Sequence, residues 1–214
     1  ELQQFDPIRG AGANFVSNAD GITNTGFEIE LYYAATDRLT LSGNFSYTET
    51  EYGEDYFVFT VDDPINPVPV FGTFTQGFVS AQVTDPSQAS DYTVNLKGGP
   101  LKGIPEEKAT IRVSYEQDTR FGPLYYLLSH SYTGDFSASG IQRPLDRIDS
   151  RETTNLNISW YSQDGNLSLR AYVDNLFDND NYYALSTGDH ETNYRKSVTA
   201  LPPRVMGLDI RYRF

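Results

Sequence analysis

Apolar and polar side chains alternate at every second position through long runs of this chain. In the run 26–35, one set of alternate positions is apolar or aromatic and the other carries Glu28 and Glu30. Successive side chains of a β-strand point to opposite faces, so the pattern predicts strands with one apolar and one polar face. No run shows the helical period. The chain is therefore expected to be all-β.

Seven alternating runs can be distinguished, and a further strand end is expected at residues 1–5. The seven runs are 26–35, 38–48, 109–116, 124–133, 155–160, 167–174 and 206–214. In the run 124–133 the phase stays open because Tyr125, Tyr126, Leu127 and Leu128 are consecutive. The expected architecture is an antiparallel meander of about seven to eight strands.

The connections between these runs alternate between short and long. The short ones lie near 36–37, 118–122 and 163–165, and the long ones span about 49–107, 134–151 and 177–202. Transmembrane barrels have tight periplasmic turns and long outer loops. A soluble β-sandwich has turn signals every ~8–12 residues without this rhythm. For the loop 49–107 we expect strands extending above the membrane or a folded external cap.

The composition agrees with a barrel and excludes several other classes. The mean hydropathy is −0.49, and the longest apolar runs, Leu31–Ala35 and Leu124–Leu128, are far shorter than the ~20 residues of a spanning helix. A barrel strand turns only alternate side chains to lipid, so low hydropathy excludes a helical membrane protein only. The net charge of −13 and the absence of a basic stripe argue against nucleic-acid binding.

The polar positions of the runs carry charged residues, as expected of a water-filled barrel interior. The interior-facing candidates are Glu28, Glu30, Arg38, Arg112, Arg170 and Asp174. Tyrosines gather towards the ends of the runs, where the aromatic girdles of a membrane barrel lie. A soluble sandwich also alternates, so that alternative stays open.

Catalytic and metal-binding patterns are weak. His130 and His190 are the only histidines, and neither lies in a serine elbow or beside a cysteine, of which the chain has none. Asp174, Asp178 and Asp180 lack the glycine and terminal glutamate of a calcium-binding EF-hand loop. We expect no enzyme activity, no metal site and no cofactor.

Motifs in the last third of the chain resemble one family. Asn175-Leu176-Phe177-Asp178, followed by Tyr182 and Tyr183, resembles the strand-to-loop junction of TonB-dependent outer-membrane receptors. Pro203 and Arg204 before a last strand with Tyr212 and Phe214 resemble the C-terminus of that family. Upstream, the segment 18–30 resembles its "Asn-x-x-Gly-x-Glu-x-Glu" pattern.

The resemblance implies a large barrel of 22 strands with an internal plug domain, of which residues 1–214 form the C-terminal segment without the plug and the first strands. It implies active import of a scarce nutrient of the siderophore, cobalamin or oligosaccharide class. The implied partners are outer-membrane lipid, TonB, the nutrient ligand and, through Phe214, the barrel-assembly machinery. The implied location is the outer membrane of a Gram-negative bacterium.

Two alternatives remain at this stage. A complete eight-stranded barrel, acting as a pore or adhesin, fits the length, and a soluble β-sandwich binding module fits the alternation. For ligand contact the aromatic residues of the long loop are candidates. They are Tyr56, Phe57, Phe59, Phe71 and Phe74.

Overall fold

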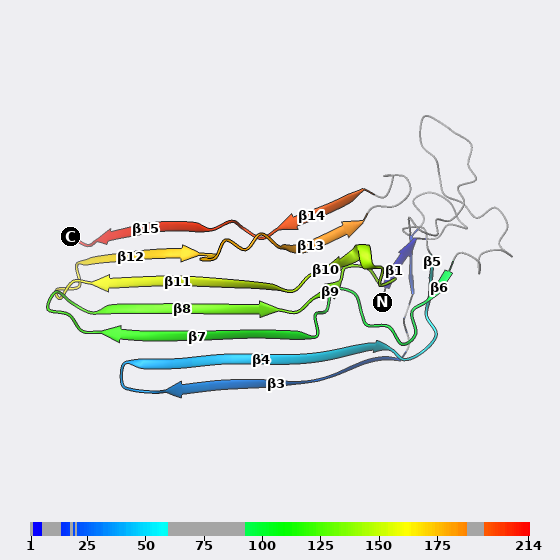
Figure 1. Ribbon diagram of the computed structural model, residues 1–214, viewed down its shortest axis with the longest axis horizontal. Helices are drawn as coiled ribbons and strands as arrows, with labels where there is room; N and C mark the ends of the chain where they lie inside the picture. Colours follow the sequence, from blue (N-terminus) through cyan, green and yellow to red (C-terminus); the bar gives the residue numbers. More distant parts are fainter. Residues whose placement is uncertain (1, 6–13, 18, 20, 60–92, 188–194) are drawn as a thin grey trace, which may run out of the picture.

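One large antiparallel sheet dominates the computed structural model, which describes residues 2–5, 14–17, 19, 21–59, 93–187 and 195–214 (Figure 1). Its seven strands follow the order β15-β12-β11-β8-β7-β4-β3, so strands that follow one another in the chain are neighbours. The predicted seven-stranded meander is confirmed. The strands are β3 (Ile22–Ala34), β4 (Leu39–Tyr52), β7 (Glu107–Gln117), β8 (Leu124–Thr133), β11 (Arg151–Tyr161), β12 (Leu167–Asp174) and β15 (Val205–Tyr212).

The remaining strands form two-stranded sheets outside the large one. They are β1 (Leu2–Phe5) with β2 (Asn14–Ser17), β5 (Phe57–Phe59) with β6 (Thr93–Asn95), β9 (Phe136–Ser137) with β10 (Arg147–Ile148), and β13 (Tyr182–Thr187) with β14 (Lys196–Ala200). The strand expected at residues 1–5 exists, but its partner is β2. A single 3-10 turn, η2 (Pro144–Asp146), precedes β10. No helix in the described ranges is long and apolar enough to cross a membrane.

The strand register defines the two faces of the large sheet. Directly opposed residues of antiparallel neighbours share a face. Phe45 is opposite both Ile29 and Ala109, and Leu208 is opposite Ala171, so the apolar positions of all strands fall on one side. Tyr126 is opposite Tyr115, which fixes the phase that the sequence left open in β8. Tyr125 and Leu127 therefore lie on the polar face.

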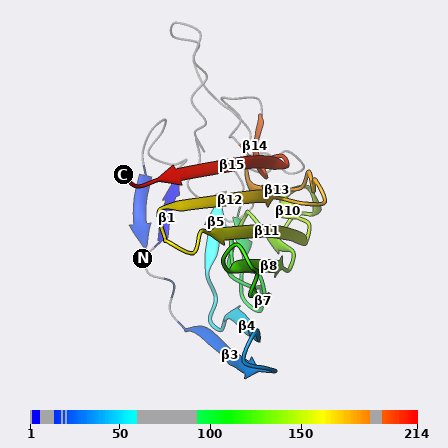
Figure 2. The same ribbon diagram turned by 90° about the vertical axis from the view of Figure 1, so that its left-hand side faces the viewer.

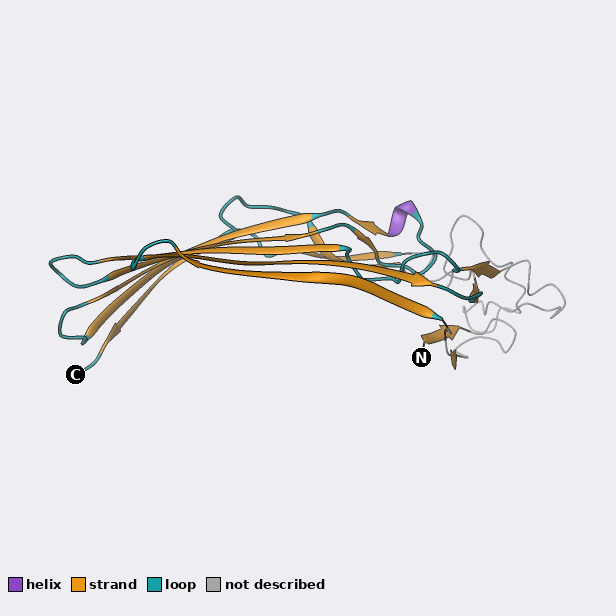
Figure 3. Cartoon of the chain, turned by 90° about the horizontal axis from the view of Figure 1, so that it is seen from below, coloured by secondary structure: helices purple, strands orange, loops and turns teal. Residues whose placement is uncertain are grey.

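Among the described residues, no layer covers the apolar face of the sheet over most of its length. Ile111 on the inner strand β7 keeps 56% of its surface exposed, and Ile29 and Leu208 on the two edge strands keep 56% and 64%. Figure 2 shows the strands stacked in sheet order, and Figure 3 shows them as a single twisted layer over most of their length. Soluble monomers rarely expose a contiguous apolar surface of this extent. The face is therefore built to contact an apolar environment.

The two ends of the sheet differ. The tight turns β3–β4, β7–β8 and β11–β12 lie at the end that holds the C-terminus, and the small sheets β5–β6, β9–β10 and β13–β14 lie at the other (Figure 1). In the first tight turn the Thr36 hydroxyl accepts hydrogen bonds from the backbone N–H groups of Arg38 and Leu39. The predicted alternation of short and long connections is thus present as two distinct ends.

The long connections contain more structure than their expected bounds implied. β4 continues to Tyr52, inside the expected loop 49–107, and the rings of Tyr52 and Tyr56 stack with their centroids 5.7 Å apart. These two tyrosines and Leu96 form a small buried cluster beneath β5–β6. Residues 60–92 of the expected loop 49–107 lie outside the described residues. The connection 177–202 contains the β13–β14 hairpin.

Candidate functional site

The interior-facing candidates fall on a single face of the sheet. Glu30 is opposite Asn44, Arg112 is opposite Ser42, and Arg170 is opposite Asp209, all on the side away from the apolar positions. Glu28 and Asp174 follow the same alternation in β3 and β12, and Arg38 directly precedes the apolar-face Leu39 of β4. The structure does not gather these six residues into a single cluster, because they are spread over β3, β7, β12 and the turn before β4.

At the short-turn end, two of these arginines form ion pairs. The Arg38 guanidinium lies 2.6 Å from the Asp118 carboxylate, and Arg170 lies 3.6 Å from that of Asp209. Arg170 also donates two hydrogen bonds to the Asn157 side chain, at 2.7 and 3.1 Å. Exposed pairs of this kind contribute at most about 1 kcal/mol each, so their main effect is to hold the side chains against the wall.

The guanidinium of Arg170 also stacks on Tyr172, whose own position depends on a glycine that the sequence reasoning missed. The Arg170 Cζ lies 5.1 Å from the centre of the Tyr172 ring. The ring in turn covers Gly207 of β15 so closely that a Cβ there would lie 2.5 Å from Tyr172 Cζ. Only glycine leaves room for this contact.

The Asn-Leu-Phe-Asp motif forms the junction between β12 and the next loop. Asn175 is buried and has a positive φ of 51°, which asparagine tolerates better than most residues. Its side-chain oxygen accepts a hydrogen bond from the Asn179 N–H, and its side-chain nitrogen donates to the carbonyls of Asn179 and Pro202, all at 2.9 Å. Asn175 therefore holds the segment that follows β12 against the segment that precedes β15.

The second half of the motif, Phe177 and Asp178, is held to the segment that precedes β15. Asp178 also has a positive φ, 55°, and its carboxylate accepts a 2.8 Å hydrogen bond from the backbone N–H of Arg204. The Arg204 guanidinium donates to the Leu176 carbonyl at 3.4 Å. Motif residues that lie far apart in the sequence, Asn175–Asp178 and Pro203–Arg204, are thus brought together at one strand end.

The aromatic residues of the motifs lie at the surface. Phe177, which lies between the left-handed residues Asn175 and Asp178, is 76% exposed. Tyr212 and Phe214 form an edge-to-face pair with centroids 5.0 Å apart. Phe177 lies at the loop end of the sheet and the Tyr212–Phe214 pair at the short-turn end, and both are strand ends, where interfacial aromatic anchors occur in membrane barrels.

A cavity lies on the polar face at the loop end of β7, β8 and β11. The register places Lys108, Thr133 and Arg151 in one cross-strand row, and all three line this cavity of about 530 Å³. Apolar and aromatic residues of the loops, Phe136 and Tyr183 among them, complete its walls. Sequence reasoning missed Lys108 and Arg151 because both lie outside the predicted runs 109–116 and 155–160, whereas β7 and β11 begin earlier, at Glu107 and Arg151.

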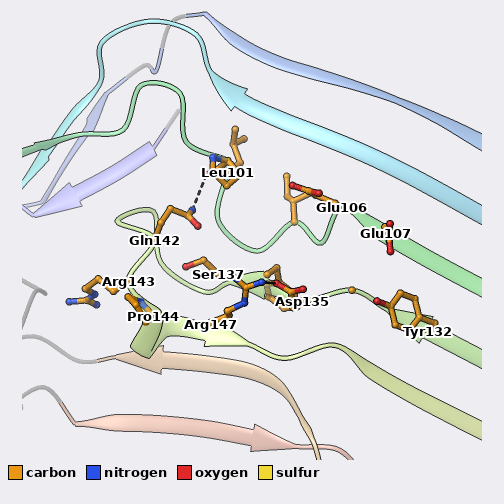
Figure 4. A pocket seen from close by; sticks show the side chains of 14 residues that line it. Leu101, Glu106, Glu107, Tyr132, Asp135, Ser137, Gln142, Arg143, Pro144 and Arg147 are labelled. Atoms are coloured by element: carbon orange, nitrogen blue, oxygen red, sulfur yellow. Dashed lines mark hydrogen bonds and ion pairs between the residues drawn. The ribbon is translucent and has the colours of Figure 1, made fainter.

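A second cavity, of about 480 Å³, lies on the side of the apolar face (Figure 4). Glu107 and Tyr132 line it, and both occupy apolar-face positions, opposite Tyr47 and Ala109. Its basic residues are paired: Arg147 with Asp135, and the buried Arg143 with Asp146 at 2.5 Å. The Gln142 amide donates to the Pro100 carbonyl at 2.9 Å. These contacts bind the loop segments to one another.

The remaining candidates occupy different places. Tyr56 is buried in the small cluster with Tyr52, and Phe57 is exposed. Phe59 ends β5, and Phe71, Phe74 and His190 lie outside the described residues. His130 Nδ1 is 2.9 Å from the Thr154 hydroxyl, directly across the sheet on the apolar face. In the described part of the chain no three His, Cys, Asp or Glu side chains are placed to hold a metal ion.

A sequence profile of the family described as "TonB dependent receptor-like, beta-barrel" matches residues 2–176. The chain belongs to this family. The predicted family is thereby confirmed, and the all-β class agrees with it. Comparison with curated protein sequences gives no match.

Solved structures of the family have the same fold. The ferric yersiniabactin uptake receptor FyuA of Yersinia pestis matches with a TM-score of 0.62 and 18% identity over 90% of this chain and 24% of FyuA. The siderophore receptor PiuA of Acinetobacter baumannii gives 0.59 and 15%, over 89% of this chain and 22% of PiuA. The ferric citrate transporter FecA gives 0.59 and 16%, over 90% and 24%. The chain spans about a quarter of the length of these receptors.

Proposed function

We propose that this chain forms wall and outer loops of a TonB-dependent active transporter in the outer membrane of a Gram-negative bacterium. The observation that carries the proposal is the single-layer sheet, which has one exposed apolar face and one polar face. Lipid would cover the apolar face, and the polar face would line the barrel interior. The tight turns would then lie in the periplasm and the long connections outside the cell.

The proposed cargo is a metal chelate of the siderophore class. FyuA takes up ferric yersiniabactin, PiuA is a siderophore receptor, and FecA transports ferric citrate. These three receptors share the fold at low sequence identity, so they support a class of ligand rather than a particular one. Transport, and no enzymatic reaction, is the activity we assign.

The chain would act as the closing part of a larger barrel. β3 and β15 are the two edges of the large sheet, and in the described residues neither pairs with a further strand. An eight-stranded barrel would require these edges to meet through one more strand, whereas β1 pairs with β2. We therefore assign the missing wall and the plug to other parts of the receptor. TonB and the barrel-assembly machinery are its proposed partners.

The test is uptake of radiolabelled iron chelates by cells that carry or lack the full-length receptor. A panel of ferric citrate and several ferric siderophores is offered in iron-poor medium. We expect at least one chelate to enter only when both the receptor and TonB are present. Uptake that continues without TonB, or equal uptake of every chelate without the receptor, would contradict the proposal.

The loop 49–107 is proposed to take part in capturing the ligand from outside. Its base is held by the Tyr52–Tyr56–Leu96 cluster, and the exposed Phe57 stands next to that cluster. Aromatic faces of this kind can stack on a flat chelate. Deleting residues 60–92 from the full-length receptor keeps the cluster and is expected to lower uptake. Unchanged uptake would refute this role.

A further inference from the structure

Two basic residues stand on either side of a threonine at the loop end of the polar face. Lys108 of β7 is opposite Thr133 of β8, and Thr133 is opposite Arg151 of β11. Strands of a sheet are about 4.8 Å apart, so the two cations lie two strand spacings from each other across the same row. All three residues line the cavity of about 530 Å³.

The described lining of this cavity is basic, with no counter-charge. It contains Lys108 and Arg151 but neither aspartate nor glutamate, and the rest is apolar, aromatic or hydroxyl-bearing. This contrasts with the second cavity, where Arg147 and Arg143 both have a carboxylate partner. It contrasts also with the whole chain, whose net charge is −13.

The environment of the Arg151 guanidinium is the main evidence for the role of this cavity. Its Nη1 atom is closed off from solvent and has no hydrogen-bond partner among the described residues. The guanidinium is held over the Phe136 ring, with Cζ 5.7 Å from the ring centre. A buried donor without an acceptor is unfavourable, and the cost is larger for a charged group. Arg151 also lines the cavity, so the ring and the closed-off Nη1 hold the guanidinium in place, and its other N–H groups are the donors that an incoming anion can reach.

We infer that this cavity is an anion-binding subsite that takes a carboxylate or catecholate group of the transported chelate between Arg151 and Lys108. Arg151 would supply the directed hydrogen bonds, because its planar fork matches two oxygens of such a group. Lys108 would add a second positive charge from the opposite wall, and Thr133 a hydroxyl donor between them. The inference rests on the proposed transport function and narrows its ligand to anionic chelates.

The test measures binding to the purified full-length receptor by calorimetry. The anionic probes are ferric citrate and the ferric complex of 2,3-dihydroxybenzoate, and the neutral probe is ferric tris(acetohydroxamate). Replacing Arg151 with Gln removes a charge-assisted interaction, so we expect binding of the anionic probes to weaken about 10-fold to 100-fold. R151K should lose less, because it keeps the charge. K108M should weaken binding by a smaller factor than R151Q.

The matched control is R211Q, which removes an arginine from the same face at the short-turn end, in the row of Ser168. It should leave the affinity for all probes unchanged.

If the receptor binds the neutral probe as well as the anionic ones, or if R151Q affects all of them equally, the proposed anion-binding subsite is wrong while the transport proposal stands. If R151Q lowers the unfolding temperature but no affinity, Arg151 pairs with a carboxylate of the receptor itself, and the inference also fails. Loss of TonB-dependent uptake for every chelate would instead remove the transport function.

Discussion

Replacing Asn175 with alanine tests whether the strand junction depends on this one side chain. The substitution removes three hydrogen bonds of 2.9 Å and leaves the backbone groups of Asn179 and Pro202 without these partners. At about 0.5–1.5 kcal/mol each, the bonds account for about 1.5–4.5 kcal/mol. Alanine at the positive φ of 51° adds about 1 kcal/mol. The expected loss of local stability is therefore about 2.5–5.5 kcal/mol.

Glycine at position 175 separates the two causes. It loses the same hydrogen bonds but adopts a positive φ without strain, so N175G should be more stable than N175A by about 1 kcal/mol. N166A is the surface control, since Asn166 lies in an exposed turn and its side chain donates only to Asp164. It should change stability by less than about 0.5 kcal/mol.

The assay is hydrogen exchange, followed by mass spectrometry on the full-length receptor in detergent. Peptides covering residues 175–181 should open about 60-fold to 9,000-fold more often in N175A than in the unmodified protein. Peptides from β7 and β8 should not change. Equal exchange in N175A and the unmodified protein, or faster exchange in N175G than in N175A, would refute the reasoning.

Three further predictions follow from single contacts. Gly207→Ala should destabilise β15 by about 1–3 kcal/mol, because the added Cβ would overlap the ring of Tyr172. Thermal unfolding measures the loss, and most of it should disappear when Tyr172 is also replaced by alanine. Ser162→Ala should raise the pKa of Asp164, whose carboxylate is stabilised first by the Ser162 hydroxyl; NMR titration of labelled aspartate measures this. Because the folded pKa is depressed, the stabilisation is present above the unfolded pKa and is lost as the pH falls through the folded one. Asp146→Asn breaks a buried ion pair and should loosen the β13–β14 hairpin by about 3 kcal/mol, seen as faster hydrogen exchange there.

The strands and their faces could be predicted from the sequence because alternation is a local signal. The face on which Phe27, Ile29 and Leu31 lie follows from their alternation alone, without information on the neighbouring strands. The run 124–133 does not, since four consecutive apolar residues fit either phase. The pairing of Tyr126 with Tyr115 decides which residues of this run lie on the apolar face, and strand pairing is a property of the assembled sheet.

The site was less predictable. The motif 175–178 could be located, but the left-handed backbone of Asn175 and Asp178 could not be predicted, because no sequence pattern reveals their φ values. The basic cavity requires Lys108 and Arg151, separated by a whole hairpin, to meet across Thr133. Such a row exists only once the register of three strands is fixed. The same holds for Gly207, whose role depends on the ring of Tyr172 on the neighbouring strand.

The central claim is that the apolar face of the sheet meets lipid while the polar face lines a barrel interior. The chain contains no cysteine, so single cysteines can be introduced at successive positions of β15 in a receptor free of other thiols, and then spin-labelled in lipid vesicles. The measurement is the collision rate of each label with oxygen, which concentrates in lipid, and with a water-soluble nickel complex. We expect labels at 206, 208, 210 and 212 to collide mainly with oxygen and those at 209 and 211 mainly with nickel; position 207 stays glycine because the Tyr172 ring covers it. Equal accessibility along the strand, or the opposite phase, would contradict the account.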